Sequence, residues 1–213
     1  MNELNMLWNL GKTYPFQVFR HRIYLPILSL IDRCKDLLRG IKTEDIVELK
    51  ELGINPKLGV RYQPTSYTTL KRVLTIGKNL GFDTIVDIGC GNGRCLVVAN
   101  EVGFSNLFGV DISSKLIENS QLNFHKLHIN AHLNICDVSK YELPDGDFVV
   151  FIFNPFGADK ISELVKKLVS RKSKYLVIYH NPKHSECFPS EPIHVDLKKH
   201  FGMYDELTYF YEL

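Results

Sequence analysis

The chain has 213 residues, of which 45% are hydrophobic and 23% are charged, and its formal net charge is +2 at pH 7. This length fits one domain with an extension, and the apolar fraction is sufficient for a sizeable core. A net charge so close to zero gives no electrostatic indication of nucleic-acid binding. The five cysteines include no C-x-x-C pair, so we expect a reduced, cytoplasmic protein with neither disulfides nor a metal site.

Residues 1–69 lack the alternation of strand and helix patterns seen later in the chain, and we expect a helical extension and cap here. The apolar run at 23–31 is too short to span a membrane as a helix. Because basic residues flank it within 20–35, two interpretations remain open. The first, which we favour, is a helix packed on the core or on another subunit. The second is an amphipathic helix on a membrane surface. Residues 32–60 are polar and turn-rich, which is typical of a linker or cap.

A loop at 61–67, which contains Tyr62, precedes a predicted helix over 68–79. Ser66 or Thr68 suits the N-cap of that helix. The most informative run follows at 84–93, where a short β-branched strand leads into Gly89, Gly91 and Gly93. A glycine loop between a strand and a helix lets backbone N–H groups approach a ligand closely. A dinucleotide site has G-x-G-x-x-G, whereas this run has G-x-G-x-G with Asp87 before it.

The next two predicted strands, 106–110 and 131–136, are each followed by an acid, Asp111 and Asp137. An acid about 20 residues past a glycine loop commonly binds ribose hydroxyls, because a carboxylate accepts hydrogen bonds from both. We expect Ser114 to cap the helix over 115–128, which leaves Asp111 available for a ligand. For Asp137 the alternative is an ordinary turn residue at the end of a strand.

The unbroken apolar run at 148–153 is typical of a central parallel strand, and it leads into Asn154, Pro155 and Phe156. A fifth strand at 174–180 ends on His180, so its end and Asn154 should lie on one rim of the sheet. His180 could serve as a general base, or it could hydrogen-bond within a loop. The tail, at 193–200 and 205–213, predicts an antiparallel pair of strands.

The run at 84–93 resembles motif I of the class I S-adenosylmethionine (SAM) dependent methyltransferases. The resemblance implies a Rossmann-like three-layer α/β sandwich with a mostly parallel seven-stranded sheet in residues 70–213. It also implies that Asp87 contacts the methionine end of SAM, Asp111 the ribose and Asp137 the adenine. The full set of expected cofactor-binding residues is Tyr62, Asp87, Gly89, Cys90, Gly91, Gly93, Asp111, Ile112, Asp137, Val138 and Asn154.

Asn154-Pro155-Phe156 resembles a shortened form of the N-P-P-[FY] motif of amino-group methyltransferases, with one proline missing. This resemblance implies that Asn154 orients the acceptor, and Pro155, Phe156 and His180 complete the predicted catalytic set. The Tyr62 loop and the Asn-Pro-Phe run also resemble the Dot1-like lysine methyltransferases.

We therefore predict SAM-dependent methyl transfer, with N-methylation favoured. The acceptor would be a protein lysine, a small amine or a glycan, and an oligomer is compatible with the sequence. The alternatives are a non-catalytic SAM-binding module and an NAD-dependent oxidoreductase.

Overall fold

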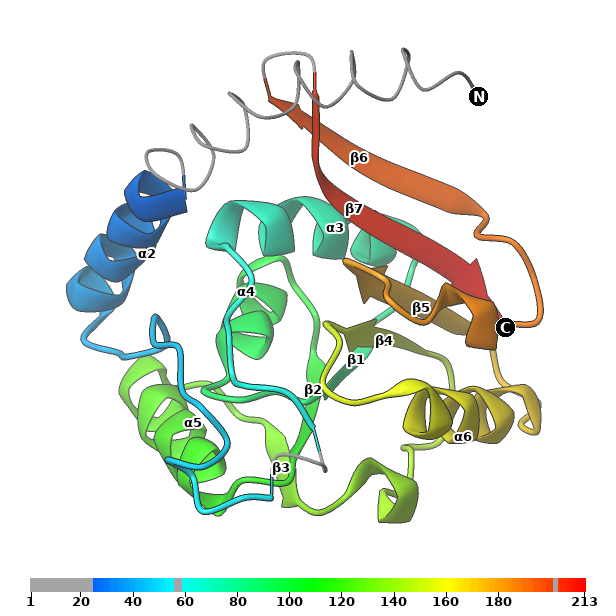
Figure 1. Ribbon diagram of the computed structural model, residues 1–213, viewed down its shortest axis with the longest axis horizontal. Helices are drawn as coiled ribbons and strands as arrows, with labels where there is room; N and C mark the ends of the chain where they lie inside the picture. The colour runs from blue at the N-terminus through cyan, green and yellow to red at the C-terminus, as the bar shows by residue number, and fades with distance from the viewer. Residues whose placement is uncertain (1–24, 56–58, 201–202) are drawn as a thin grey trace, which may run out of the picture.

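The computed structural model describes residues 25–55, 59–200 and 203–213, and it contains one seven-stranded sheet (Figure 1). The strand order is β3-β2-β1-β4-β5-β7-β6. The strands are β1 (Thr84–Ile88), β2 (Asn106–Asp111), β3 (His132–Ile135), β4 (Phe148–Ile152), β5 (Tyr175–His180), β6 (His194–His200) and β7 (Met203–Glu212). The first five are parallel, and β7 and β6 complete the sheet as an antiparallel pair. This confirms the predicted Rossmann-like fold with its mostly parallel sheet.

Helices cover both faces of the sheet, because the central strands carry apolar side chains on both sides. Residues of α3 (Tyr67–Asn79), α4 (Arg94–Glu101) and α5 (Ser114–Leu127) pack with one set of strand side chains. Residues of α6 (Ala158–Val169) pack with the other set. Along β4, Val149 and Phe151 belong to the first layer, and Phe148, Val150 and Ile152 belong to the second. This alternation follows from the two-residue repeat of a strand.

The chain reverses its direction across the sheet between β1 and β4, which are neighbours although β2 and β3 separate them in the sequence. In open α/β sheets, ligands bind outside the carboxyl ends of the strands at such a switch point. The glycine loop follows β1 and the Asn-Pro-Phe run follows β4. Two short 3-10 helices, η3 (Val138–Lys140) and η4 (Ser185–Cys187), lie in the loops after β3 and β5.

The N-terminal helix α2 (Leu25–Arg39) is longer than the apolar run that predicted it. The prediction of a turn-rich linker or cap over 32–60 is therefore wrong for 32–39, which are helical. The helix continues because Asp32 and Asp36, which made this stretch look polar, face inward and are buried. Residues 20–24 of the proposed basic flank lie outside the described residues. No helix in the described part of the chain is long and apolar enough to cross a membrane.

A buried arginine links this N-terminal helix to the glycine loop. Arg94 is the first residue of α4, directly after Gly93, and its side chain is 2% exposed. Its Nη1 lies 3.0 Å from Oδ2 of Asp32, and its Nη2 lies 2.5 Å from Oε2 of Glu44. Burial acts to lower the pKa of Arg94, but the acidic groups around it, chiefly Glu44, outweigh burial and raise it. The arginine is therefore a fixed positive charge between the extension and the core.

Replacing Arg94 by Met should destabilise the protein, because it leaves Asp32 and Glu44 without their cationic partner. Breaking a buried ion pair from one side costs about 3–5 kcal/mol of unfolding free energy. The matched control is Arg33→Met on the exposed side of α2, which should change stability by less than about 0.5 kcal/mol. Urea unfolding of the two variants compares them directly, and equal stabilities would contradict a structural role for Arg94.

Candidate functional site

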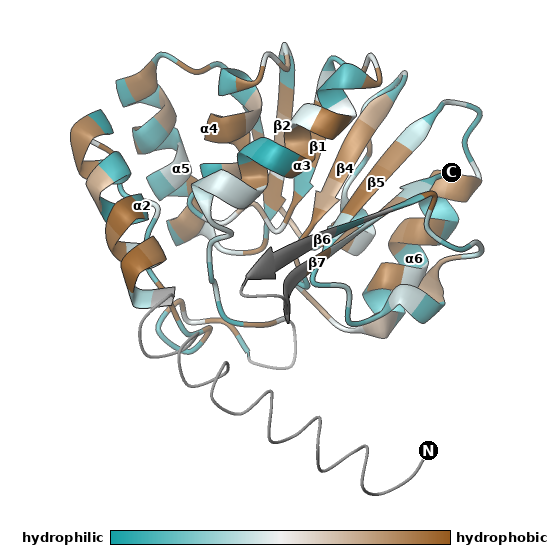
Figure 2. Cartoon of the chain, turned by 90° about the horizontal axis from the view of Figure 1, so that it is seen from above, coloured by the Kyte–Doolittle hydropathy of each residue, from teal (hydrophilic) through white to brown (hydrophobic). Residues whose placement is uncertain are grey.

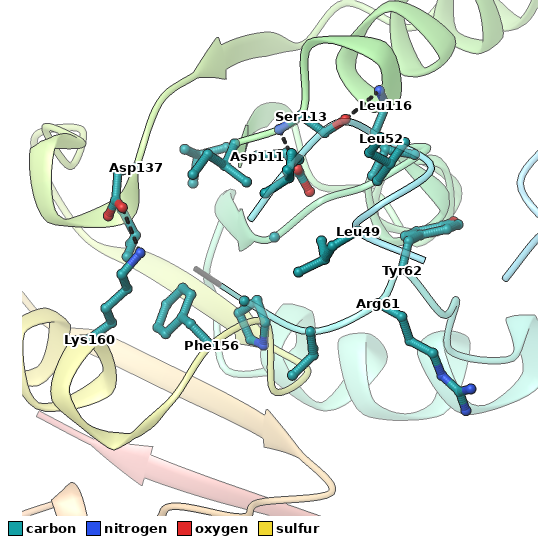
Figure 3. Close-up of a pocket in the computed structure, with 18 of the residues that line it drawn as sticks. Leu49, Leu52, Arg61, Tyr62, Asp111, Ser113, Leu116, Asp137, Phe156 and Lys160 are labelled. Atoms are coloured by element: carbon teal, nitrogen blue, oxygen red, sulfur yellow. Dashed lines mark hydrogen bonds and ion pairs between the residues drawn. The ribbon is translucent and has the colours of Figure 1, made fainter. Parts of the chain in front are cut away.

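A pocket lies at the carboxyl ends of β1, β2 and β4, at the switch point of the sheet (Figure 3). The empty space inside and in front of it amounts to about 760 Å³, including the part open to solvent. Leu49, Leu52 and Val60 line one wall, and the ends of the strands form the other. Most of the lining is apolar, with a few polar groups among it, which suits an organic ligand better than a bare ion.

The apolar wall belongs to a covering segment, residues 47–55 and 59–63, that runs over the strand ends. Val47 and Tyr62 pair through two backbone hydrogen bonds of 3.1 and 2.9 Å. The amide of Val60 donates to the carbonyl of Pro155 at 3.1 Å, and the Tyr62 hydroxyl donates to the carbonyl of Thr43 at 2.9 Å. The segment is thus joined both to the N-terminal extension and to the end of β4.

The amides of the glycine loop are bonded within the protein. Those of Gly89 and Cys90 donate to the carbonyl of Val110 at 2.9 and 3.0 Å, and that of Gly93 donates to the carbonyl of Cys90 at 2.9 Å. The amide of Gly91 donates to Asp111 Oδ2 at 2.9 Å. The expectation that these N–H groups face a ligand is therefore wrong for these four. A phosphate site at a helix N-terminus needs such donors to be available.

Two of the loop glycines are required by close packing. A Cβ atom on Gly89 would lie 2.6 Å from Cβ of Pro155, and one on Gly91 would lie 2.1 Å from the ring of Tyr62. Both residues also have positive φ, +80° and +53°, which L-residues rarely adopt. The absence of side chains lets the Asn-Pro-Phe run and the covering segment pack directly on the loop.

Asp87 is almost fully buried at the end of β1 and lines a smaller cavity that adjoins the main pocket. Both cavities share Tyr62, Gln63, Gly89 and Phe153 as lining residues. Burial, and then the nearby charge of Asp111, raise the pKa of Asp87 to about 8. The carboxyl is therefore readily ionised by a cationic ligand that replaces the missing solvation.

Asp111 lines the main pocket and also fixes the glycine loop. Its Oδ2 accepts from the Gly91 amide and its Oδ1 from the Ser113 amide, both at 2.9 Å. Burial raises the pKa of Asp111, although these amide bonds act in the opposite direction. The helix that follows is capped by Ser113, whose Oγ accepts from the Leu116 amide, so the prediction of Ser114 as the cap was one residue late.

Asp137 lines the far side of the pocket and pairs with Lys160, whose Nζ lies 2.5 Å from Oδ2 (Figure 3). Its Oδ1 accepts from the amide of Ser139 at 3.0 Å. Partial burial acts to raise the pKa of Asp137, but the bonds from Lys160 and Ser139 outweigh it and lower the pKa. Lys160 comes from α6 and had no sequence signal as a site residue.

Asn154 is buried at the end of β4, and its carboxamide is bonded to the neighbouring strand end rather than turned to the pocket. Its Oδ1 accepts from the Tyr179 hydroxyl at 2.8 Å, and its Nδ2 donates to the Asn181 carbonyl. Asn154 and Asn181 both have positive φ, +42° and +48°. Such backbone conformations are costly for residues other than glycine and cluster at functional sites.

His180 is also buried, and its Nδ1 lies 3.0 Å from Oγ1 of Thr208 on β7. Its ring packs on Phe153 with centroids 4.9 Å apart. Neither His180 nor Asn154 lines the pocket, whereas Pro155 and Phe156 do. Both polar side chains are held away from the pocket by hydrogen bonds to residues on or beside neighbouring strands. A sequence pattern does not reveal such partners.

The structure brings most of the predicted site residues to the two adjoining cavities. Those that line them are Tyr62, Asp87, Gly89, Cys90, Asp111, Ile112, Asp137, Val138, Pro155 and Phe156. Gly91 and Gly93 line neither cavity and instead pack closely against the rings of Tyr62 and Phe124. Sequence reasoning missed the apolar wall, whose only signal was the repeated apolar residues Leu49, Leu52 and Ile54 in an otherwise polar stretch.

Comparison with known proteins agrees with this geometry. Residues 85–171, which include the glycine loop, Asp111, Asp137 and Asn154, match the family described as "Methyltransferase domain". A protein-lysine N-methyltransferase of Saccharolobus islandicus is 25% identical over 116 residues, which is 54% of this chain and 71% of that protein. A ribosomal protein L11 methyltransferase of Thermosipho melanesiensis is 26% identical over 132 residues. That match covers 58% of this chain but only 48% of the relative, about half of its length.

Among solved structures, magnesium protoporphyrin IX methyltransferase from Synechocystis with bound SAM has the same fold, with a TM-score of 0.51 at 14% identity. The alignment covers 68% of this chain and 76% of that one. The matched family and the two relatives, together with the shared fold, support a class I SAM-dependent methyltransferase.

Proposed function

We propose that the two adjoining cavities hold SAM and that the chain transfers its methyl group to an amino group of a protein. The observation that carries the cofactor assignment is the commitment of the four glycine-loop amides to protein acceptors. A loop in which these four amides are already bonded suits a cofactor that lacks phosphates. The carboxylates at three successive strand ends suit a cation with ribose hydroxyls. Both features disfavour the NAD-dependent alternative.

In this arrangement the cofactor lies along the strand ends. Asp87 in the smaller cavity would face the charged methionine end, and Asp111 would accept from the ribose hydroxyls. Asp137 would contact the adenine edge, beside Ile112 and Val138. Each of these residues lines one of the two cavities, which supports the order but leaves each contact as a prediction.

The chemistry requires little of the protein beyond positioning. The nitrogen lone pair of an unprotonated amine attacks the methyl carbon, the carbon–sulfur bond breaks, and a proton leaves the new ammonium group. The products are S-adenosylhomocysteine and the methylated amine. Because the sulfonium is already activated, the main contribution is to hold donor and acceptor in line and to exclude water. The covering segment, closed over the strand ends, suits the exclusion of water.

For the acceptor, the support is the pair of relatives, which are named as methyltransferases of proteins. We place the acceptor beside Pro155 and Phe156, which line the pocket after β4. Asn154 then acts as a positioning residue, whose left-handed backbone directs these two residues inward. Residues 70–213 would form the catalytic domain and residues 1–69 its extension and cap.

A non-catalytic SAM-binding module is the second candidate. It is favoured by one observation, the engagement of the Asn154 carboxamide by Tyr179 and Asn181. Methyl transfer from labelled SAM into proteins of the source organism distinguishes the two candidates. Incorporation into protein that depends on the purified enzyme supports the proposed function, and SAM binding without any incorporation supports the second candidate.

The cofactor site predicts that SAM stabilises the protein against heat, whereas NAD does not. Asp111→Asn should weaken SAM binding at least about tenfold, since a bond to a charged group contributes about 1.5–3 kcal/mol. The matched control is Glu118→Gln on the exposed side of α5, which should bind as the wild type does. Calorimetric titration measures the SAM affinity of the wild type and of the two variants. In the thermal measurement, stabilisation by NAD alone would contradict the assignment of SAM to the site.

Asp87 predicts a pH dependence of SAM binding. Its pKa is about 8 in the ligand-free protein, so the ionised form that a cation prefers increases as the pH rises toward 8. Affinity should rise by up to about tenfold per pH unit below pH 8, with release of a proton on binding. Calorimetry in buffers of different ionisation enthalpy counts that proton, and Asp87→Asn should release none.

The same carboxyl affects the stability of the ligand-free protein. From its ordinary pKa of 3.8 upward, Asp87 ionises in the unfolded chain, while the folded protein keeps the proton until about pH 8. The free energy of unfolding should therefore fall as the pH rises through this window, because the folded state binds more protons than the unfolded state. Asp87→Asn should flatten that part of the profile, and an unchanged slope in this variant would count against the raised pKa.

Two substitutions of Asn154 separate a backbone role from a carboxamide role. Asn154→Gly keeps access to positive φ and should retain methyl transfer within about threefold, because the turn is preserved. Asn154→Ala strains the turn and should lower turnover by about tenfold or more, because misplaced reactants lose rate steeply. Single-turnover methylation with saturating SAM measures both. Equal, large losses in the two variants would instead make the carboxamide catalytic.

A further inference from the structure

An ordinary surface helix buries its apolar side and exposes its polar side, whereas helix α2 does the reverse. Its inward side is polar, because its two acidic residues, Asp32 and Asp36, are buried and bonded to Arg94, Tyr67 and Thr43. Its outward side is apolar. The exposed large apolar residues are Ile27, Leu30, Ile31, Leu37 and Leu38. Figure 2 shows α2 at the edge of the molecule with hydrophobic colour along its length.

These residues form one continuous stripe. Positions 27, 30, 31, 34 and 38 recur at the three- and four-residue spacing of one helix face, and position 34 is an exposed cysteine. Leu37 and Leu38 are 80% and 88% exposed, so almost nothing of the described chain covers them. A contiguous apolar patch of this kind marks an interaction surface.

The charges beside the stripe are positive. Arg33 is exposed on one side of it. On the other side lie Lys35, whose Nζ is 3.8 Å from Oδ1 of Asp32, and Arg39, and both cations also lie over the ring of Tyr67. Lys35 and Arg39 also line a groove between α2 and α3 together with Lys71, Arg72 and Glu101. Although Arg39 pairs with Glu101 and Arg72 with Asp196, cations outnumber acids along this groove. An apolar stripe between cations complements a surface that is apolar inside and anionic outside.

We propose that α2 lies in the plane of an anionic membrane surface, with the stripe at the acyl boundary and the flanking cations at lipid phosphates. No helix among the described residues is long and apolar enough to cross a membrane, and a helix with one apolar side suits this parallel placement. A second copy of the chain fits less well. An antiparallel pair of α2 helices would bring Arg33, near the middle of the helix, toward its own copy, with both acids of each helix buried. The proposal concerns the placement of the enzyme and does not depend on the identity of the methyl acceptor.

Vesicle flotation of the full chain tests this placement. The probes are phosphatidylcholine vesicles with and without about 30% phosphatidylglycerol, at about 0.1 M and about 0.5 M salt. We expect binding to the anionic vesicles alone, and weaker binding at the higher salt. Leu30→Gln/Leu38→Gln should reduce the bound fraction at least about tenfold, because it removes apolar area from the stripe. Arg33→Glu should also reduce it, through repulsion of lipid phosphates.

Matched controls replace exposed residues elsewhere. Leu80→Gln/Val169→Gln removes two apolar residues that are 59% and 55% exposed at the ends of α3 and α6. Lys172→Glu reverses an exposed charge after α6. Both should bind vesicles as the wild type does, and SAM-induced thermal stabilisation checks that every variant is folded. Absence of vesicle binding, or binding that the stripe variants leave unchanged, overturns the proposal. A dimer in sedimentation equilibrium that Leu30→Gln/Leu38→Gln dissociates would assign the stripe to a second copy instead.

Discussion

The buried guanidinium of Arg94 joins the N-terminal extension to the glycine loop through ion pairs. It stands at the N-terminus of α4, where the helix dipole is unfavourable for a cation, and it is nearly inaccessible to water. Asp32, Asp36 and Glu44 of the N-terminal extension supply the compensating charge. A buried charge without partners costs several kcal/mol, so the extension and the glycine loop must form together. The extension therefore contributes to the stability of the proposed cofactor site.

This coupling explains the form of the pocket. The segment after α2 passes over the glycine loop, where Tyr62 rests on Gly91 and Val60 bonds to Pro155. The loop directs its amides to Val110 and Asp111, so it serves as a packed surface instead of an anion cradle. What remains open to a ligand is a mostly apolar cavity with carboxylates at its edges. Such a cavity favours a cofactor that is cationic and free of phosphate.

The sequence predicted the parts that depend on local periodicity and on strand ends. The seven strands, the glycine loop and the acids Asp111 and Asp137 are of this kind, because parallel strands bring their carboxyl ends to one edge. It failed where the outcome depends on partners distant in the chain. Asp32 and Asp36 are polar residues that their own stretch of sequence does not show to be buried, because their partner Arg94 lies far along the chain. In the same way, the partner of Asp137 is Lys160 of another helix. The orientation of the Asn154 carboxamide depends on Tyr179 and Asn181 of the neighbouring strand, which no local pattern reveals.

We propose that SAM occupies the two adjoining cavities with its methionine end toward Asp87 and its adenine toward Asp137. A crystal structure of the chain with S-adenosylhomocysteine tests it most directly. We predict ribose hydroxyls within hydrogen-bond distance of Asp111, and loop amides still bonded to Val110 and Asp111. A ligand bound outside these cavities would contradict this placement of SAM. Loop amides that donate to the ligand and no longer to their protein acceptors would also contradict it.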